Sequence, residues 1–242
     1  MKQNLLTGLL ALLAGPLLAA DGNPKTDVLN AAAALGSQTN YSWRTTVETG
    51  NNSRFRPGPT EGKTEKGGYT TLMMSFGDNT TEAVLAGTNG ALKTADRGWQ
   101  SLGEAAKDDG GGFSPAMFLA RTLQNFKAPA VQAAELAGQT TDLKKGTNGI
   151  SGDLTEDGAK ALLTFQPRGG NGGGEGLTVS NAKGSATFWI PAGKLAKYQF
   201  HLQGTVSFNG NDREIDRTTT VEIREVNSTK IEVPDDAKKK LP

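Results

Sequence analysis

The segment 197–224 carries the longest alternation of apolar and polar positions in the chain. Apolar side chains occupy every second position of its first half, apart from a glycine at 204: Tyr198, Phe200, Leu202, Val206 and Phe208. A period of two predicts a β-strand with one dry face. Asn209 and Gly210 then predict a tight hairpin, because both central positions of a type I′ turn need a positive φ. We therefore expect a long β-hairpin around which the rest of the chain is organised.

Shorter segments of the same kind lie on both sides of this hairpin. The segment 41–48 alternates Tyr41, Trp43, Thr45 and Val47 with polar side chains, as in a half-buried strand. Turn residues divide the following region into strand-like pieces at 60–66, 69–76, 81–89, 90–96 and 98–102. Further strands are expected at 149–154, at 185–190 and around 231–233. Short strands separated by turns predict an antiparallel sheet.

Apolar residues at helical spacing and helix-start residues predict several helices. They are expected at 24–35, at 117–126, from 129 onward, at 155–163 and as a short turn after 234. Asn23 and Thr155 are suitable N-caps, and Ser114 before Pro115 is a third. We read the face of the first helix as Val28, Leu29, Ala32 and Leu35.

The beginning of the chain has the pattern of a secretory signal peptide. Lys2 is followed by an apolar run from Leu5 to Leu18 and by the small residues Ala19 and Ala20. The run is shorter than the roughly 20 apolar residues of a membrane anchor. We therefore expect residues 1–20 to be removed on export, to the periplasm or the exterior, and 21–242 to form a single soluble domain.

Composition narrows the classes of function. The 242 residues include no cysteine, so the chain has neither disulfides nor the lipobox cysteine of a bacterial lipoprotein. The formal net charge is +1, which gives no basic field for nucleic acid. We expect no nucleic-acid partner and no transmembrane segment in the mature chain.

Motifs for metal or catalytic chemistry are incomplete in this sequence. His201 is the only histidine, and it lies on the strand face opposite Phe200, so we interpret it as a solvated residue. The segment 153–158 resembles the start of a calcium loop, but position twelve is Thr164 in place of the closing carboxylate. The glycine-rich segments 108–112 and 169–176 have no phosphate-loop lysine or dinucleotide spacing. We therefore predict a non-enzyme without metal or cofactor.

The remaining candidate for function is the apolar face of the sheet together with the helices beside it. Its ligand-binding candidates are Trp43, Met73, Met117, Leu123, Phe188, Tyr198, Phe200, Leu202 and Phe208. Aromatic and methionine side chains on such a face either fill a core or line a cavity. The sequence leaves both interpretations open.

The order of elements resembles that of the LolA/LppX-type carriers of the bacterial cell envelope. It comprises a signal peptide, an N-terminal helix, a meander, a central helical insertion, a short helix and a long hairpin before IEVPDDAKKKL. The resemblance implies an α+β fold, in which a curved antiparallel half-barrel carries helices on its concave face. A cavity between the two would take a lipid acyl chain. The missing lipobox cysteine departs from the lipidated members.

Two hypotheses of function follow from the sequence and this resemblance. The first is an exported carrier that binds a hydrophobic small molecule or lipid in that cavity. The alternative is a non-enzymatic envelope module of the same fold that binds another envelope protein or senses stress. A continuous apolar cavity would favour the first, and a large exposed apolar patch would favour the second.

Overall fold

The structure, a computed structural model, describes residues 22–50, 57–76, 79–107, 114–164, 177–208 and 210–241. The predicted signal peptide, the glycine-rich segments at 108–112 and 169–176, and Asn209 lie outside these residues. The statements below concern the described part of the chain.

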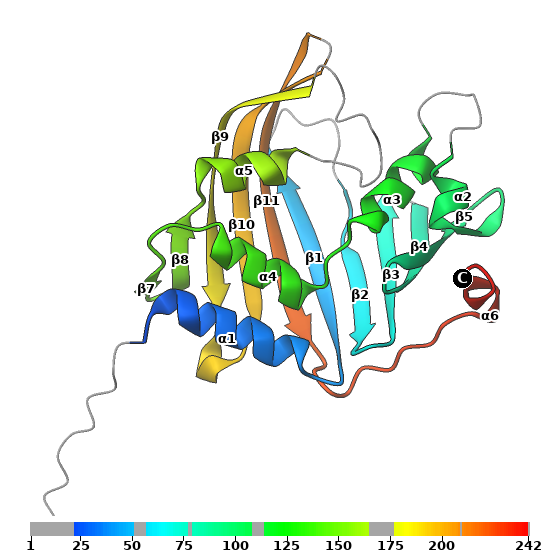
Figure 1. Ribbon diagram of the computed structural model, residues 1–242, viewed down its shortest axis with the longest axis horizontal. Coiled ribbons are helices and arrows are strands. Elements are labelled where there is room, and N and C mark those ends of the chain that lie inside the picture. The colour runs from blue at the N-terminus through cyan, green and yellow to red at the C-terminus, as the bar shows by residue number, and fades with distance from the viewer. Residues whose placement is uncertain are drawn as a thin grey trace, which may run out of the picture.

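One large antiparallel sheet forms the centre of the molecule (Figure 1). Its strands are β1 (Asn40–Thr49), β2 (Thr60–Glu65), β3 (Tyr69–Phe76), β4 (Asn79–Ala86), β5 (Asn89–Thr94), β6 (Gly98–Ser101), β7 (Lys144–Gly146), β8 (Gly149–Asp153), β9 (Leu177–Trp189), β10 (Lys197–Phe208) and β11 (Asn211–Arg224). Their order is β6-β5-β4-β3-β2-β1-β11-β10-β9-β8-β7, and the sheet is open. The predicted hairpin, β10–β11, therefore lies next to β1 in the middle of the sheet.

The helices lie mainly on one side of this sheet. They are α1 (Pro24–Gly36), α2 (Leu102–Ala105), α3 (Pro115–Gln124), α4 (Pro129–Gly138), α5 (Glu156–Leu163) and α6 (Asp235–Lys238), with a 3-10 turn at Pro191–Gly193. In Figure 1, α4 and α5 cross in front of the central strands, and α1 runs along α4. The predicted class, a curved antiparallel sheet with helices in an α+β fold, is confirmed.

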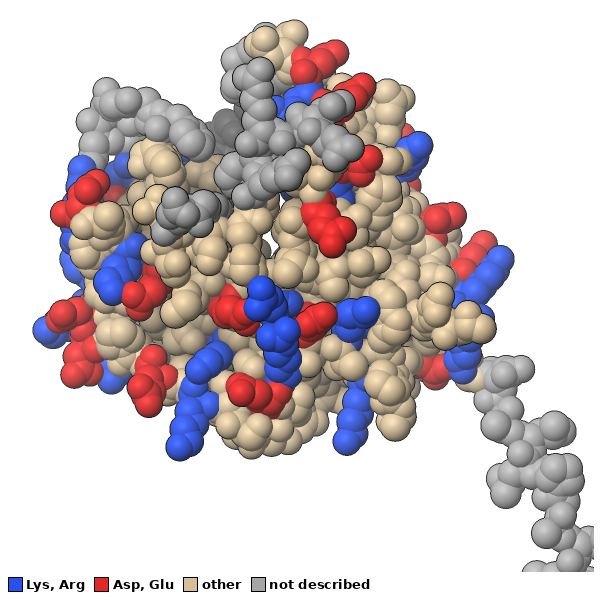
Figure 2. All heavy atoms as spheres, turned by 180° about the vertical axis from the view of Figure 1, so that it is seen from behind, with Lys and Arg blue, Asp and Glu red and all other residues tan. Residues whose placement is uncertain are grey.

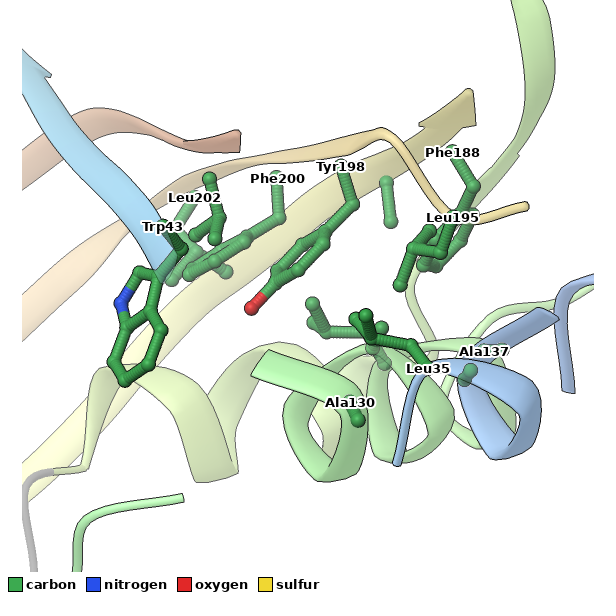
Figure 3. Packing of buried hydrophobic residues seen from close by; sticks show 14 of the residues in the cluster. Leu35, Trp43, Ala130, Ala137, Phe188, Leu195, Tyr198, Phe200 and Leu202 are labelled. Atoms are coloured by element: carbon green, nitrogen blue, oxygen red, sulfur yellow. The ribbon is translucent and has the colours of Figure 1, made fainter. Parts of the chain in front are cut away.

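The main core lies in the layer between the sheet and these helices. Cross-strand pairs place Phe188, Tyr198 and Val221 side by side, and all three are at most 1% exposed. Figure 3 shows such side chains pointing from the strands toward Leu35, Ala130 and Ala137 of the helices. At roughly 1.5–3 kcal/mol for each large apolar side chain, this burial strongly fixes the register of the strands.

The opposite, convex face of the sheet is polar over most of its area. Figure 2, the view from behind, shows cations and anions interspersed across it. The exception is the short helix α6, which packs on β5 and β6. Val84, Ala91 and Ala237 are each at most 2% exposed and lie outside the main core cluster. A small second core thus fixes the end of the chain to the convex face.

Several predicted local features were wrong. Leu29 is 38% exposed and Ala31 lies on the buried face of α1 in its place. Ser114 precedes α3 but makes no side-chain cap hydrogen bond. The segment around Ile231 and Val233 is not a strand, because it crosses beneath the sheet toward α6 without a neighbouring strand.

Met73 was also expected on the inner face, and it lies on the convex face. The register pairs Met73 with Glu61 on β2, and its side chain is 51% exposed. Its neighbours Leu72 and Met74 have the buried positions on β3, with exposures of 4% and 7%. Three consecutive apolar residues left the strand face ambiguous in the sequence.

Candidate functional site

A cavity of about 720 Å³ lies between the sheet and the layer formed by α3, α4 and α5. Residues of β1, β2, β3, β10 and β11 line it on one side: Trp43, Thr45, Thr60, Leu72, Met74, Tyr198 and Thr219. Helix residues and their connections line the other: Thr122, Leu123, Asn125, Phe126, Lys127, Pro129, Gln132, Glu135, Leu136, Gln139, Lys160, Ala161, Leu162 and Thr164. The cavity is thus built from segments far apart in the chain.

Trp43 and Phe126 form one wall of this cavity. Their ring centroids are 6.0 Å apart with an angle of 21° between the planes, so the rings are stacked. Trp43 is only 2% exposed, because the indole lies between Phe126 and the backbone of Gly62. A stacked aromatic pair of this kind gives the wall a rigid apolar surface.

Tyr198 places a hydroxyl group between the sheet and the helices. Its Oη donates to Oε1 of Gln132 on α4 at 2.6 Å. Burial raises the pKa of Tyr198 well above its ordinary value of 10.0, so the phenol is neutral at physiological pH. In Figure 3 the hydroxyl oxygen points away from the strands, toward the helix layer. It therefore contributes a fixed polar group to a wall that also carries apolar side chains and three threonines.

Charged side chains of α4, α5 and the connection between α3 and α4 contribute polar groups to the lining. Lys127 pairs with Glu135 at 2.5 Å, and Lys160 pairs with Glu156 at 2.7 Å. The hydrogen bond that Lys160 donates to Glu156, together with the negative charge of Glu156, raises the pKa of Lys160. Lys127 and Glu135 are each more than 40% exposed, so this pair reaches solvent. The cavity therefore combines an apolar wall with a charged, solvent-exposed part.

The structure brings together some of the predicted ligand-binding residues and separates others. Trp43, Leu123 and Tyr198 line the cavity. Phe188, Phe200 and Leu202 are buried in the adjoining core at 0%, 6% and 0% exposure, and they do not line it. Met117 lies half-buried on α3 outside the lining. Met73 is on the convex face, and the side chain of Phe208 lies outside the described residues.

Sequence reasoning missed several residues of the cavity. Leu72 and Met74 carried a usable signal, since they alternate with Met73 along β3. Phe126 ends the predicted helical pattern, but nothing in the sequence places it against Trp43. Gln132 and Thr219 are polar positions in apolar patterns, and only the tertiary fold brings them to the same cavity.

The motifs considered for metal chemistry have structural explanations here. Asp153–Gly158 is a strand-to-helix turn, in which Thr155 caps α5 by accepting from the N–H of Gly158 at 3.0 Å. His201 lies on the convex face and contacts Asp216 at 2.8 Å. No group of three or more potential metal ligands is found among the described residues. The described helices include none that is long and apolar enough to cross a membrane.

The fold is that of a curved antiparallel sheet in an α+β protein, with a cavity of mixed polar and apolar lining under the helix layer. A comparison with solved structures finds lipoprotein LppX of Mycobacterium tuberculosis, at 10% identity and a TM-score of 0.49, covering 89% of this chain and all of the other. LprF from Mycobacterium bovis is similar at 13% identity and a TM-score of 0.44, covering 88% and 97%. LppX, which this comparison finds, is of the carrier type that the order of elements in the sequence resembles. No family model matches the sequence, and a search of curated proteins finds no match either.

Proposed function

We propose that this chain is an exported carrier that binds an acyl chain or another hydrophobic molecule in the cavity between its sheet and its helices. The observation that carries the proposal is the cavity itself. Its volume of about 720 Å³ falls within the roughly 300–1,000 Å³ that is typical of small-molecule sites. Trp43, Phe126 and Leu72 supply apolar surface, and the polar residues of the lining are available to orient a ligand.

The charged groups of the cavity support binding rather than catalysis. Lys127 and Lys160 are each paired with a glutamate, and Tyr198 is neutral and bonded to Gln132. The one histidine is on the other face of the sheet. Export is proposed from the leader-like residues 1–20. A place outside the cytoplasm fits a carrier that moves an apolar molecule between membranes.

The test is a matched pair of tryptophan substitutions on β1. Thr45 lines the cavity, whereas the adjacent Thr46 faces the convex side. Both side chains are half-buried, so the two substitutions should disturb the local packing to a similar extent. We expect Thr45→Trp to fill the cavity and to weaken binding of the neutral probe N-phenyl-1-naphthylamine at least about tenfold. Thr46→Trp is expected to bind like the wild type.

Native mass spectrometry of the purified protein provides the second measurement. A co-purifying apolar molecule that is lost from Thr45→Trp and kept by Thr46→Trp would support the carrier. Equal probe binding by the two variants, with no co-purifying molecule, would favour the protein-binding envelope module instead.

A further inference from the structure

Arg217 is a cation on the concave face of the sheet. It lies on β11, opposite Leu202 of β10 and Thr49 of β1, and paired residues of neighbouring antiparallel strands point to the same face. Leu202 is 0% exposed and points into the layer between sheet and helices (Figure 3). The same face of β11 also carries the exposed Arg213 near the start of the strand and Ile215, Thr219, Val221 and Ile223 along its length. The guanidinium group of Arg217 therefore lies between Ile215 and Thr219, further along the strand than Arg213.

This guanidinium group has few partners. Nη2 donates to the carbonyl oxygen of Leu162, in the last turn of α5, at 3.0 Å. Nε is buried and has no hydrogen-bond partner within the part of the chain that the structure describes. No ion pair joins Arg217 to a carboxylate in the described ranges, and burial alone lowers its pKa. A guanidinium group has five N–H donors, and the hydrogen bond to Leu162 is the one that Arg217 makes to the described residues.

Arg217 is half-buried with its Nε out of contact with solvent, and a cation in this position without a carboxylate partner among the described residues is unfavourable for folding. Removing a charge from water has a large desolvation cost, which only a close counter-charge and further hydrogen bonds offset. An apolar side chain of similar size would pack on this face at no such cost. The arginine at this position therefore suits a bound anion better than it suits the packing of the sheet.

Arg217 does not itself line the cavity but lies next to two residues that do. Leu162, whose carbonyl oxygen it contacts, lines the cavity, and so does Thr219. Thr219 is the next residue on the same face of β11, roughly 7 Å along the strand, which is within reach of an arginine side chain. An apolar chain in the cavity can thus present its polar end to this guanidinium group.

We propose that Arg217 binds the acidic group of the carried ligand, a carboxylate or a phosphate at the end of an apolar chain that occupies the cavity. This inference rests on the proposed function. The planar fork of the guanidinium group matches either anion with two parallel N–H donors. In the structure, the carbonyl oxygen of Leu162 accepts one hydrogen bond from this guanidinium group.

The test compares the wild type with Arg217→Met, which keeps an unbranched side chain and removes the charge. The matched control is Arg224→Met on the same strand, since Arg224 is exposed and paired with Glu222 at 2.8 Å. Dodecanoate, dodecyl phosphate and dodecanol compete with N-phenyl-1-naphthylamine, and thermal unfolding is followed in parallel. The comparison of dodecanoate with dodecyl phosphate shows whether the bound acidic group is a carboxylate or a phosphate.

We expect the wild type and Arg224→Met to prefer one of the two acidic ligands over dodecanol by about tenfold or more. Arg217→Met is expected to lose this preference, to bind dodecanol as before and to unfold at the same or a higher temperature. Arg217→Lys should retain part of the preference.

Two results would overturn the inference while leaving the carrier intact. One is equal binding of the acidic and neutral ligands by the wild type. The other is an Arg217→Met variant that keeps the preference but unfolds at a lower temperature, which would make Arg217 a structural cap of α5. If none of the three ligands displaces the probe, the proposed function itself fails.

Discussion

The indole ring of Trp43 lies directly over the backbone of Gly62, its partner across β1 and β2. A Cβ atom at position 62 would overlap the ring atoms of the indole. The absence of a side chain at Gly62 therefore allows Trp43 to lie flat on the sheet and to stack on Phe126. One glycine in a strand thus shapes the aromatic wall of the cavity.

Gly62→Ala is therefore expected to displace the indole. The ring cannot move away from the sheet without disturbing its contact with Phe126, so we expect a loss of about 1–3 kcal/mol of stability, as for overpacked cores. Urea unfolding followed by tryptophan fluorescence measures this loss. The matched control is Gly138→Ala at the end of α4, where an added Cβ meets no atom within 4 Å. A loss of stability in the control but not in Gly62→Ala would contradict the proposed role of Gly62.

The sequence predicted the strands far better than it predicted the cavity. β3 spans Tyr69–Phe76, the same residues as the predicted piece, because turn residues mark both of its ends. The face was harder to assign, since Leu72, Met73 and Met74 are all apolar. Only the pairing of Leu72 with Gly62 determines which of them points inward. Strand boundaries are local information, whereas strand faces depend on the neighbours.

The cavity depends on contacts that have no local signal. Phe126 follows a helix some eighty positions after Trp43, and no pattern relates the two residues before the chain has folded. The segment around Ile231 is a case in which a local pattern predicted a strand that the fold does not contain. Two alternating apolar residues suggested a strand, but the hydrogen bond beside this segment comes from a side chain, since Nζ of Lys63 donates to the carbonyl oxygen of Lys230 at 3.3 Å.

The C-terminal helix is expected to detach when its buried residue becomes charged. Ala237 is 0% exposed, and α6 packs on β5 and β6. Ala237→Asp would bury an unpaired carboxylate, so we expect α6 to leave the sheet at a cost of about 1–2 kcal/mol. Limited proteolysis should then remove the end of the chain faster than in the wild type. Val226→Asp, at a site that is 43% exposed, should behave like the wild type, and equal cleavage of all three proteins would argue against the docking of α6.

The start of α5 depends on one side-chain cap. Oγ1 of Thr155 accepts from the N–H of Gly158 at 3.0 Å. Thr155→Ala removes this hydrogen bond and should reduce stability by about 1 kcal/mol, with faster hydrogen exchange in the first turn of α5. Thr155→Ser keeps the hydroxyl and should exchange like the wild type. If the alanine and serine variants exchange alike, the hydroxyl is not what fixes this helix start.

The buried phenol of Tyr198 makes the stability of the protein sensitive to alkaline pH. Its pKa is raised well above 10.0 by burial, so the folded protein holds this proton at a pH where the unfolded chain has lost it. The folded state then binds more protons than the unfolded state, and the free energy of unfolding falls as pH rises above about 10. Below that pH the stabilising contribution is complete. Burial also raises the pKa of Tyr41, which contributes in the same direction.

The Tyr198→Phe variant isolates the contribution of this phenol to the pH dependence of stability. At neutral pH the variant should lose about 1–2 kcal/mol, because Oε1 of Gln132 loses the donor that lies 2.6 Å away. From about pH 9 to pH 11 its stability should fall less steeply than that of the wild type, since one buried phenol has been removed. Chemical unfolding at a series of pH values measures both quantities. Parallel pH profiles would show that Tyr198 ionises equally easily in the folded and unfolded states, contrary to its buried position against α4.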